Sequence, residues 1–185
     1  MGKFTFHETK IKGVFVVDTR TFDDRRGYFT EVYNQSDFKA AGLDYTFVQD
    51  NRSLSRKGVL RGLHFQRNHP QAKLLQVLKG EIFDVAVDLR RGSETYGQWT
   101  GEFLSEENRR QIVIPRGFAH GFLVVSDYAE LFYKCDDLYH PEDEGGICWN
   151  DADLGIEWPD VGEMLLSDKD KNLPSLKDHK VEFDL

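Results

Sequence analysis

The sequence predicts an all-β protein, a sandwich or barrel built from short strands. Short runs rich in β-branched and aromatic residues recur along the chain, and Gly, Pro, Asp or Asn bounds each of them. Helical patterns are scarce by comparison. No linker, low-complexity tract or internal repeat interrupts the 185 residues, a length that suits one hydrophobic core. We therefore expect one β domain over residues 1–185.

Strand signals appear in order along the chain. Six runs have the length and composition of strands: residues 13–18, 45–51, 58–66, 111–115, 121–126 and 129–135. Residues 73–89 hold two more runs, and Lys79-Gly80 between them predicts the turn of a hairpin. After this turn, apolar residues alternate with Asp84 and Asp88, as in a strand whose two faces meet different surroundings. Short strands at this spacing are typical of sandwiches and barrels.

Helical signal is confined to short segments. Residues 36–42 read as a short helix with Ser36 as its N-cap and Gly42 as its end. Residues 105–108 resemble a single helical turn. The tail from Ser167 onward has few apolar residues, and such a terminus is by default loosely held.

Composition excludes several classes of function. A formal net charge of −8 argues against a nucleic-acid partner, and no apolar run is long enough to cross a bilayer. The N-terminus lacks the apolar core of a secretory signal, so Cys135 and Cys148 are expected to be buried free thiols in the cytoplasm. Residues 51–80 are basic and contain no Asp or Glu. This asymmetry predicts either a local anion site or a solvated basic surface.

Two histidine motifs resemble the barrel motifs of the cupins. Residues 115–120, PRGFAH, match P-x-G-x-x-H, in which the histidine points into the barrel. The first motif, residues 58–66, carries His64 but has neither the second histidine nor the glutamate that metal-binding cupins use. A divalent metal needs three or four convergent ligands, so we expect no metal in the barrel. The remaining histidines lie in terminal or loop contexts and are expected to be ordinary exposed residues: His7, His69, His140 and His179.

Six segments together resemble one enzyme family. They are DRRGYFTE (24–31), VQDN (48–51), GVLRGLHFQ (58–66), residues 114–122, YKC (133–135) and LSDKD (166–170). In this order, and over nearly the whole chain, they are similar to the signatures of the dTDP-4-dehydrorhamnose 3,5-epimerase family. The resemblance implies a cupin-type jelly-roll barrel with a few short helices and a homodimer. It also implies epimerisation of dTDP-4-keto-6-deoxy-D-glucose at C3 and C5, in dTDP-L-rhamnose biosynthesis.

The implied reaction needs no cofactor, and the sequence has no Gly-rich dinucleotide motif. The 4-ketone of the substrate acidifies the hydrogens on both neighbouring carbons. Such an enzyme therefore needs a base, an acid on the opposite face of the sugar, and groups that stabilise the enolate.

The resemblance assigns these roles to individual residues. His64 matches the base, and an ordinary imidazole, with a pKa of about 6.5, suits proton abstraction near neutrality. Asp170 matches the carboxylate that orients the base, and docking it would tie down the tail. Tyr133 matches the acid, since a phenol stays protonated at neutral pH. Lys73 and Arg61 match cationic partners of the developing enolate oxygen.

Further positions carry over from the family as substrate-binding residues. They are Arg26, Glu31, Gln49, Asp50, Asn51, Arg61, His120, Tyr139, Glu144 and Lys169. One geometric demand follows within the first histidine motif. Strict strand alternation would place Arg61 and His64 on opposite faces, so we expect a bulge at Gly62 that turns both inward.

Three other functions remain open from sequence alone. An epimerase acting at a single carbon, or on a related nucleotide sugar, would use the same base and acid. A non-catalytic cupin that binds sugar nucleotides would not need His64, Asp170 and Tyr133 together. A metal-dependent cupin is disfavoured by the incomplete first motif.

Overall fold

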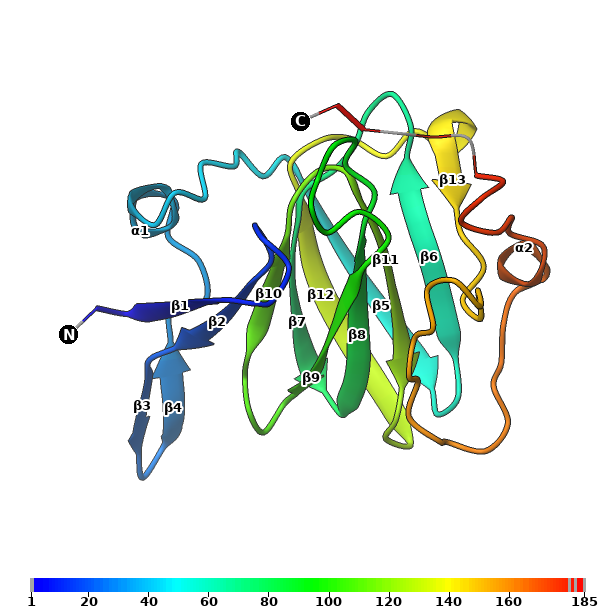
Figure 1. The fold of residues 1–185 in the computed structure, drawn as a ribbon. Helices are drawn as coiled ribbons and strands as arrows, with labels where there is room; N and C mark the ends of the chain where they lie inside the picture. The colour runs from blue at the N-terminus through cyan, green and yellow to red at the C-terminus, as the bar shows by residue number, and fades with distance from the viewer. Residues whose placement is uncertain (1, 180, 182, 185) are drawn as a thin grey trace.

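Two β-sheets packed face to face form the body of the computed structural model, which describes residues 2–179, 181, 183 and 184 (Figure 1). The larger sheet has six strands in the order β1-β2-β10-β7-β12-β5, and the smaller has five in the order β13-β6-β11-β8-β9. A separate two-stranded hairpin, β3-β4, stands away from them. The expected all-β architecture is confirmed.

The elements follow one another along the chain with few helices between them. The strands are β1 (Phe4–Glu8), β2 (Phe15–Thr19), β3 (Thr21–Asp24), β4 (Gly27–Thr30), β5 (Gln49–Arg56), β6 (Leu60–Gln66), β7 (Lys73–Lys79), β8 (Glu81–Asp88), β9 (Trp99–Ser105), β10 (Gln111–Ile114), β11 (Phe118–Val124), β12 (Tyr128–Cys135) and β13 (Glu144–Gly146). The helices are α1 (Gln35–Ala40), the 3-10 turn η1 (Pro141–Asp143) and α2 (Asp168–Lys171). None of the described helices has the length and apolar character needed to cross a membrane.

The main core lies between the two sheets. Alternation along β7 sends Leu75 and Val77 into this core, where they meet Ile82 and Ala86 of β8. Leu74, which precedes Leu75, points to the outer face, where it packs with Phe38 of α1. The six-stranded sheet is therefore buried on both faces at this point.

The C-terminal segment covers the outer face of the five-stranded sheet. Phe65, Val85 and Ile147 form the floor of this second cluster, and Leu176 and Phe183 of the tail pack against it. The tail is thus docked in the described residues, and the default of a loosely held terminus was wrong. His179 is also only 8% exposed, so the expectation of an exposed histidine there was wrong, because the tail folds back over the sheet.

The predicted hairpin at Lys79-Gly80 is a corner between the sheets. β7 pairs with β10 and β12, whereas β8 pairs with β11 and β9, so the two strands belong to different sheets. Gly80 makes the corner with φ +73°, and a Cβ there would lie 1.9 Å from the carbonyl oxygen of Tyr128. Only glycine fits such a close approach. The predicted turn at Gly80 is therefore confirmed, whereas the predicted pairing of the two flanking strands was wrong.

Several local boundaries also differ from those predicted. Helix α1 takes Asn34 rather than Ser36 as its N-cap, because the Asn34 side chain accepts hydrogen bonds from the backbone N–H groups of Ser36 and Asp37. Gly42 follows the helix with φ +84°, as expected for its end. The predicted strand at 45–51 lies later, as β5. The sequence patterns did not predict β1, β3, β4, β9, β13 and α2.

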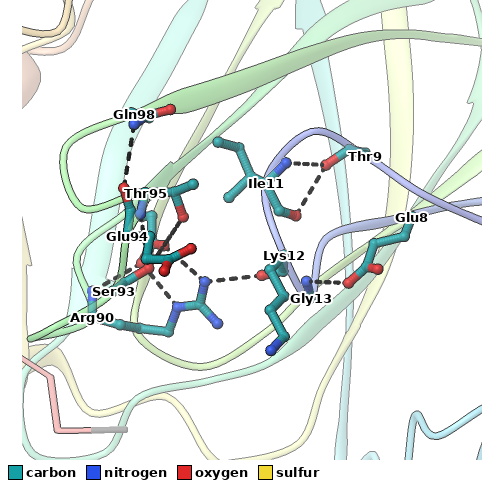
Figure 2. A network of polar contacts seen from close by, with 11 residues as sticks. Glu8, Thr9, Ile11, Lys12, Gly13, Arg90, Ser93, Glu94, Thr95 and Gln98 are labelled. Atoms are coloured by element: carbon teal, nitrogen blue, oxygen red, sulfur yellow. Dashed lines mark hydrogen bonds and ion pairs between the residues drawn. The ribbon is translucent and has the colours of Figure 1, made fainter.

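Arg90 joins the turn after β1 to the connection between β8 and β9, and Figure 2 shows it beside Lys12 of that turn. Asp88 is fully buried and accepts hydrogen bonds from Arg90, Ser93 and Thr95. The Arg90 guanidinium also donates to the backbone carbonyl of Lys12 at 2.9 Å. Burial opposes the charged form of Asp88, but these hydrogen bonds outweigh it and hold the pKa of the carboxyl below its ordinary value.

Candidate active site

A pocket opens between the two sheets at one end of the barrel. It consists of two adjoining cavities of about 280 and 730 Å³. Residues of both sheets line both cavities: His64, Lys73, His120, Tyr133, Tyr139 and Glu144. Most of these shared residues belong to strands, which hold their side chains in fixed positions.

His64 and Asp170 form a hydrogen-bonded pair, as expected. His64 projects from β6, and its Nε2 lies 2.5 Å from Oδ1 of Asp170 on α2. The Ser167 side chain caps α2 by accepting from the Asp170 backbone N–H. Burial opposes the charged form of Asp170, but the hydrogen bond with His64 outweighs it, and the carboxyl's pKa lies below its ordinary value. An ionised Asp170 on Nε2 leaves Nδ1 of His64 to face the pocket.

Tyr133 lies on the opposite wall. It belongs to β12 of the six-stranded sheet, while His64 belongs to the five-stranded sheet, and both line the two cavities. Burial raises the pKa of the Tyr133 hydroxyl above its ordinary value. The phenol therefore stays protonated at neutral pH and can donate a proton from this side.

Arg61 and Lys73 both reach the pocket, and a bulge places Arg61 there. The pairing of β6 with β11 shifts register between His64 and Arg61, and Gly62 between them has φ +130°. Arg61 and His64 both line the larger cavity, so the expected inward bulge is confirmed. Lys73 enters from β7, and burial lowers its pKa below the ordinary value.

His120 is held by an aspartate that sequence reasoning did not select. Nε2 of His120 lies 2.8 Å from Oδ2 of Asp84, and both residues are buried. Oδ1 of Asp84 has no hydrogen-bond partner among the described residues. The signal was present in the sequence, because Asp84 stands on the polar face of an otherwise apolar strand. A charge at such a position is seldom there without a partner.

Glu144 joins three groups at the mouth of the pocket. It accepts a hydrogen bond from the Tyr139 hydroxyl at 2.9 Å, pairs with Lys169 at 2.6 Å and lies 4.0 Å from Nδ1 of His64. Burial opposes its charged form, but the bonds from Lys169 and Tyr139 hold its pKa below the ordinary value. The structure therefore brings together three residues that were expected to bind substrate: Tyr139, Glu144 and Lys169.

Strand alternation divides the polar triplet on β5. Gln49 and Asn51 line the smaller cavity, and their side chains are joined by a 3.0 Å hydrogen bond. Asp50 points to the other face, where its carboxylate pairs with Lys134 at 2.7 Å. The expectation that Asp50 binds substrate has no support from this geometry, because successive residues of a strand face opposite ways.

Two expected substrate-binding residues lie outside the pocket of their own chain. Arg26 sits in the turn of the β3-β4 hairpin, where it pairs with Asp24, and Glu31 pairs with Lys3. Neither lines either cavity. In Figure 1 the hairpin projects from the side of the barrel that is opposite α2.

The basic segment contributes less to the pocket than its length suggests. Arg61 and Lys73 line the cavities, whereas Arg52 pairs with Glu130 and the other basic side chains are exposed. The anion-site prediction therefore applies to two of these residues only. Cys135 and Cys148 are free thiols, as expected. Cys135 is buried, but Cys148 is partly exposed, so the expectation of burial was wrong for Cys148.

Among the described residues, one group of side chains has the spacing to hold a metal ion. It consists of His69, Asp137 and His140, and none of them lines the two cavities. The barrel itself offers His64 and His120, each already paired with a carboxylate.

Comparisons with known proteins agree on one family. A family model described as dTDP-4-dehydrorhamnose 3,5-epimerase matches residues 8–178. The dTDP-4-dehydrorhamnose 3,5-epimerase of Methanothermobacter thermautotrophicus is 52% identical over 183 residues, which are 98% of this chain and 99% of that protein.

Solved structures show the same similarity. A dTDP-6-deoxy-D-glucose-3,5-epimerase from Legionella pneumophila, in complex with dTDP-4-keto-L-rhamnose, is 44% identical with a TM-score of 0.95, over 97% of this chain and 98% of that one. A 3'-monoepimerase from Streptomyces bikiniensis, in complex with dTDP-quinovose, is 36% identical with a TM-score of 0.87, over 92% of this chain and 87% of that one. The expected cupin-type barrel is thereby confirmed.

Proposed function

This chain belongs to the dTDP-4-dehydrorhamnose 3,5-epimerase family, and we propose that its pocket inverts C3 and C5 of dTDP-4-keto-6-deoxy-D-glucose without a cofactor. The reaction is an isomerisation in dTDP-L-rhamnose biosynthesis. One observation supports it above the others: a base and an acid stand on facing sheets of one pocket. Inversion requires that a proton leave one face of a carbon and another arrive on the opposite face.

His64 removes the proton. Asp170 holds the hydrogen on Nε2, so the lone pair on Nδ1 is free to take the proton from the carbon next to the ketone. The C–H electron pair forms the C=C bond of an enolate, and the ketone oxygen takes the negative charge. The ionised carboxylate of Asp170 stabilises the imidazolium that forms on His64. Asp170 remains an acceptor throughout and does not itself gain a proton.

Lys73 and Arg61 stabilise the enolate oxygen. Both cations line the larger cavity, and fixed positive charge beside a developing oxyanion stabilises it. A lysine with a lowered pKa also shares a proton with an oxyanion more readily than a solvated lysine does. His120, fixed by Asp84, adds a further polar group to the larger cavity.

Tyr133 completes the inversion. Its protonated hydroxyl delivers a proton to the carbon from the face opposite His64, and the enolate returns to the ketone. Exchange with solvent resets both groups. The same sequence at the second carbon gives the 3,5-epimerised product.

The nucleotide portion occupies the smaller cavity in this proposal. Gln49 and Asn51 supply amide donors and acceptors there, and Tyr139 stands at the mouth between the two cavities. Glu144 and Lys169 bind nearby polar groups of the substrate.

We propose further that the enzyme is a cytoplasmic homodimer of single-domain subunits. The β3-β4 hairpin supports the dimer, because among the described residues its strands pair only with each other, and two-stranded hairpins are marginal alone. Phe22, Tyr28 and Phe29 on it are 48%, 58% and 69% exposed, which is typical of a surface that another chain covers. The hairpin would then bring Arg26 to the diphosphate in the partner's pocket, with Glu31 beside it.

An exchange experiment tests the reaction. The protein is incubated with dTDP-4-keto-6-deoxy-D-glucose in deuterated water, and deuterium is located by NMR. Label at C3 and C5 together with inverted product is the expected result. Label at one carbon only would instead indicate a single-centre epimerase, a function that the similarity to the monoepimerase makes worth testing. Absence of label at both carbons would instead indicate a non-catalytic protein that binds sugar nucleotides.

A further inference from the structure

Two imidazoles and a carboxylate meet at the rim of the pocket, outside the reaction site. The ligand atoms of His69, Asp137 and His140 all lie within 4.8 Å of one another. The two imidazole rings stack with their centroids 4.1 Å apart and an angle of 20° between their planes. The reaction proposed above uses none of these three residues.

His140 has a second contact that is typical of metal-binding histidines. Its Nδ1 lies 3.3 Å from Oε1 of Glu142. A carboxylate on one ring nitrogen fixes the tautomer and leaves the other nitrogen, here Nε2, with its lone pair free. Such an outer carboxylate accompanies most histidines that bind a metal, and it also makes the free nitrogen a better ligand.

The side-chain amides of Gln66 and Gln71 hold the backbone on both sides of the cluster. Gln66, only 4% exposed, donates to the carbonyl of His69 at 2.7 Å and accepts from the backbone N–H of His140 at 2.6 Å. Gln71 donates to the carbonyl of Asp137 at 2.8 Å. One frame therefore positions all three residues, and binding an ion would cost only the ordering of their side chains.

We propose that His69, Asp137 and His140 form a binding site for a divalent transition metal of the zinc type. Two imidazoles and one carboxylate suit zinc, whereas magnesium and calcium prefer oxygen ligands. Zinc ligands about 2.1 Å from the ion lie about 3.4 Å apart in a tetrahedron, so the rings would have to turn out of their stack. His69 is exposed and free to turn. Three protein ligands leave a fourth position for water.

The ion would join two segments of the pocket rim. His69 precedes Pro70 and Gln71, and His140 follows Tyr139, and all three of these neighbours line the smaller cavity. An ion bound only by the folded chain stabilises it, and here it would brace the position of Tyr139. Proton transfer at His64 and Tyr133 does not depend on it, so this site stands or falls independently of the proposed function.

Calorimetric titration of the untagged protein with Zn²⁺ tests the site. We expect one ion per chain, no comparable binding of Mg²⁺, and a rise in melting temperature with Zn²⁺. Loss of an outer carboxylate typically weakens metal binding by about 10- to 100-fold, which is the effect expected for Glu142→Gln. His69→Ala, Asp137→Asn and His140→Ala each remove a ligand and should weaken binding more.

A matched control separates this site from ordinary surface binding. His7 is an exposed histidine 3.0 Å from Asp18, without a second imidazole beside it, so His7→Ala should leave Zn²⁺ affinity unchanged. The metal-free melting temperature of each variant checks its fold. The proposal is overturned if the wild type does not bind Zn²⁺, if Mg²⁺ binds equally well, or if correctly folded His69→Ala and His140→Ala retain wild-type affinity.

Discussion

Tyr133 and His64 face each other from separate sheets, so substitution of each residue should affect a different step of the reaction. In Tyr133→Phe the ring still packs, but the phenolic proton is lost. His64 can then form the enolate and return the proton to the face from which it came. We expect inverted product to fall by about 10²- to 10⁴-fold, the usual contribution of a general acid, while solvent deuterium still enters the unreacted substrate.

The ratio of exchange to inversion measures this separation by NMR. Tyr128→Phe is the matched control, since Tyr128 begins the same strand but is 51% exposed and lines neither cavity. Wild-type inversion in Tyr133→Phe would mean that Tyr133 is structural. Simultaneous loss of exchange and inversion would instead place it in enolate formation or binding.

His64 and Asp170 should behave as one unit. Once the base is removed, nothing remains for the carboxylate to orient, so the two losses cannot add. We expect the double variant His64→Asn, Asp170→Asn to be about as slow as His64→Asn alone. Asp168→Asn on the same helix is the control, because its side chain is 98% exposed. If steady-state kinetics show that the fold-losses of the two single variants multiply in the double variant, Asp170 acts elsewhere.

At the residue scale, motifs predicted the side chains that meet in the pocket better than the residues that hold them in place. His64, Asp170 and Tyr133 were identified, and the geometry brings them into one pocket. Asp84 was missed because its partner His120 is 36 residues away, and only the fold brings them together. Asp50 was chosen because its neighbours Gln49 and Asn51 match the family, although strand alternation turns it away.

At the scale of elements, local chemistry predicted strands but not their partners. The turn signal at Gly80 was correct, yet the choice between a hairpin and a corner depends on β10 and β11, which lie far along the chain. The docking of α2 has the same origin. Its four residues include no apolar side chain and predict little by themselves, whereas the pairing of Asp170 with His64 joins residues 106 apart.

The corner makes a prediction about stability. In Gly80→Ala the new Cβ would meet the Tyr128 carbonyl at 1.9 Å, in addition to the strain of φ +73°. Gly92→Ala is a matched control, with φ +75° and no atom within 4 Å. Left-handed backbone costs an alanine roughly 1–2 kcal/mol, which is the loss expected for Gly92→Ala. Overpacking adds roughly 1–3 kcal/mol, so Gly80→Ala should lose about 2–5 kcal/mol.

Urea unfolding of both variants measures the difference in unfolding free energy. Equal losses would mean that the corner relaxes around the added methyl group. It would then follow that close approach does not define the junction between the sheets.

At the scale of the whole molecule, the pocket of one chain lacks Arg26. The resemblance of the sequence to the family predicts that Arg26 binds substrate, whereas the fold places it in a hairpin turn away from both cavities. A symmetric dimer reconciles the two, because a two-fold axis gives each pocket the other chain's hairpin. Sequence alone could not show this, since it contains no information on which copy of a residue completes a site.

Mixed dimers test the exchange of hairpins directly. Arg26→Ala and His64→Asn subunits are each expected to give weakly active homodimers, the first through loss of a diphosphate contact and the second through loss of the base. In a mixed dimer, the His64→Asn chain donates an intact Arg26 to the pocket of the Arg26→Ala chain, which retains its own His64. That pocket is complete, whereas the other lacks both residues. Random pairing of equal amounts should therefore restore about a quarter of wild-type activity. If Arg26 served the pocket of its own chain, neither pocket of the mixed dimer would be complete, and co-expression would restore nothing.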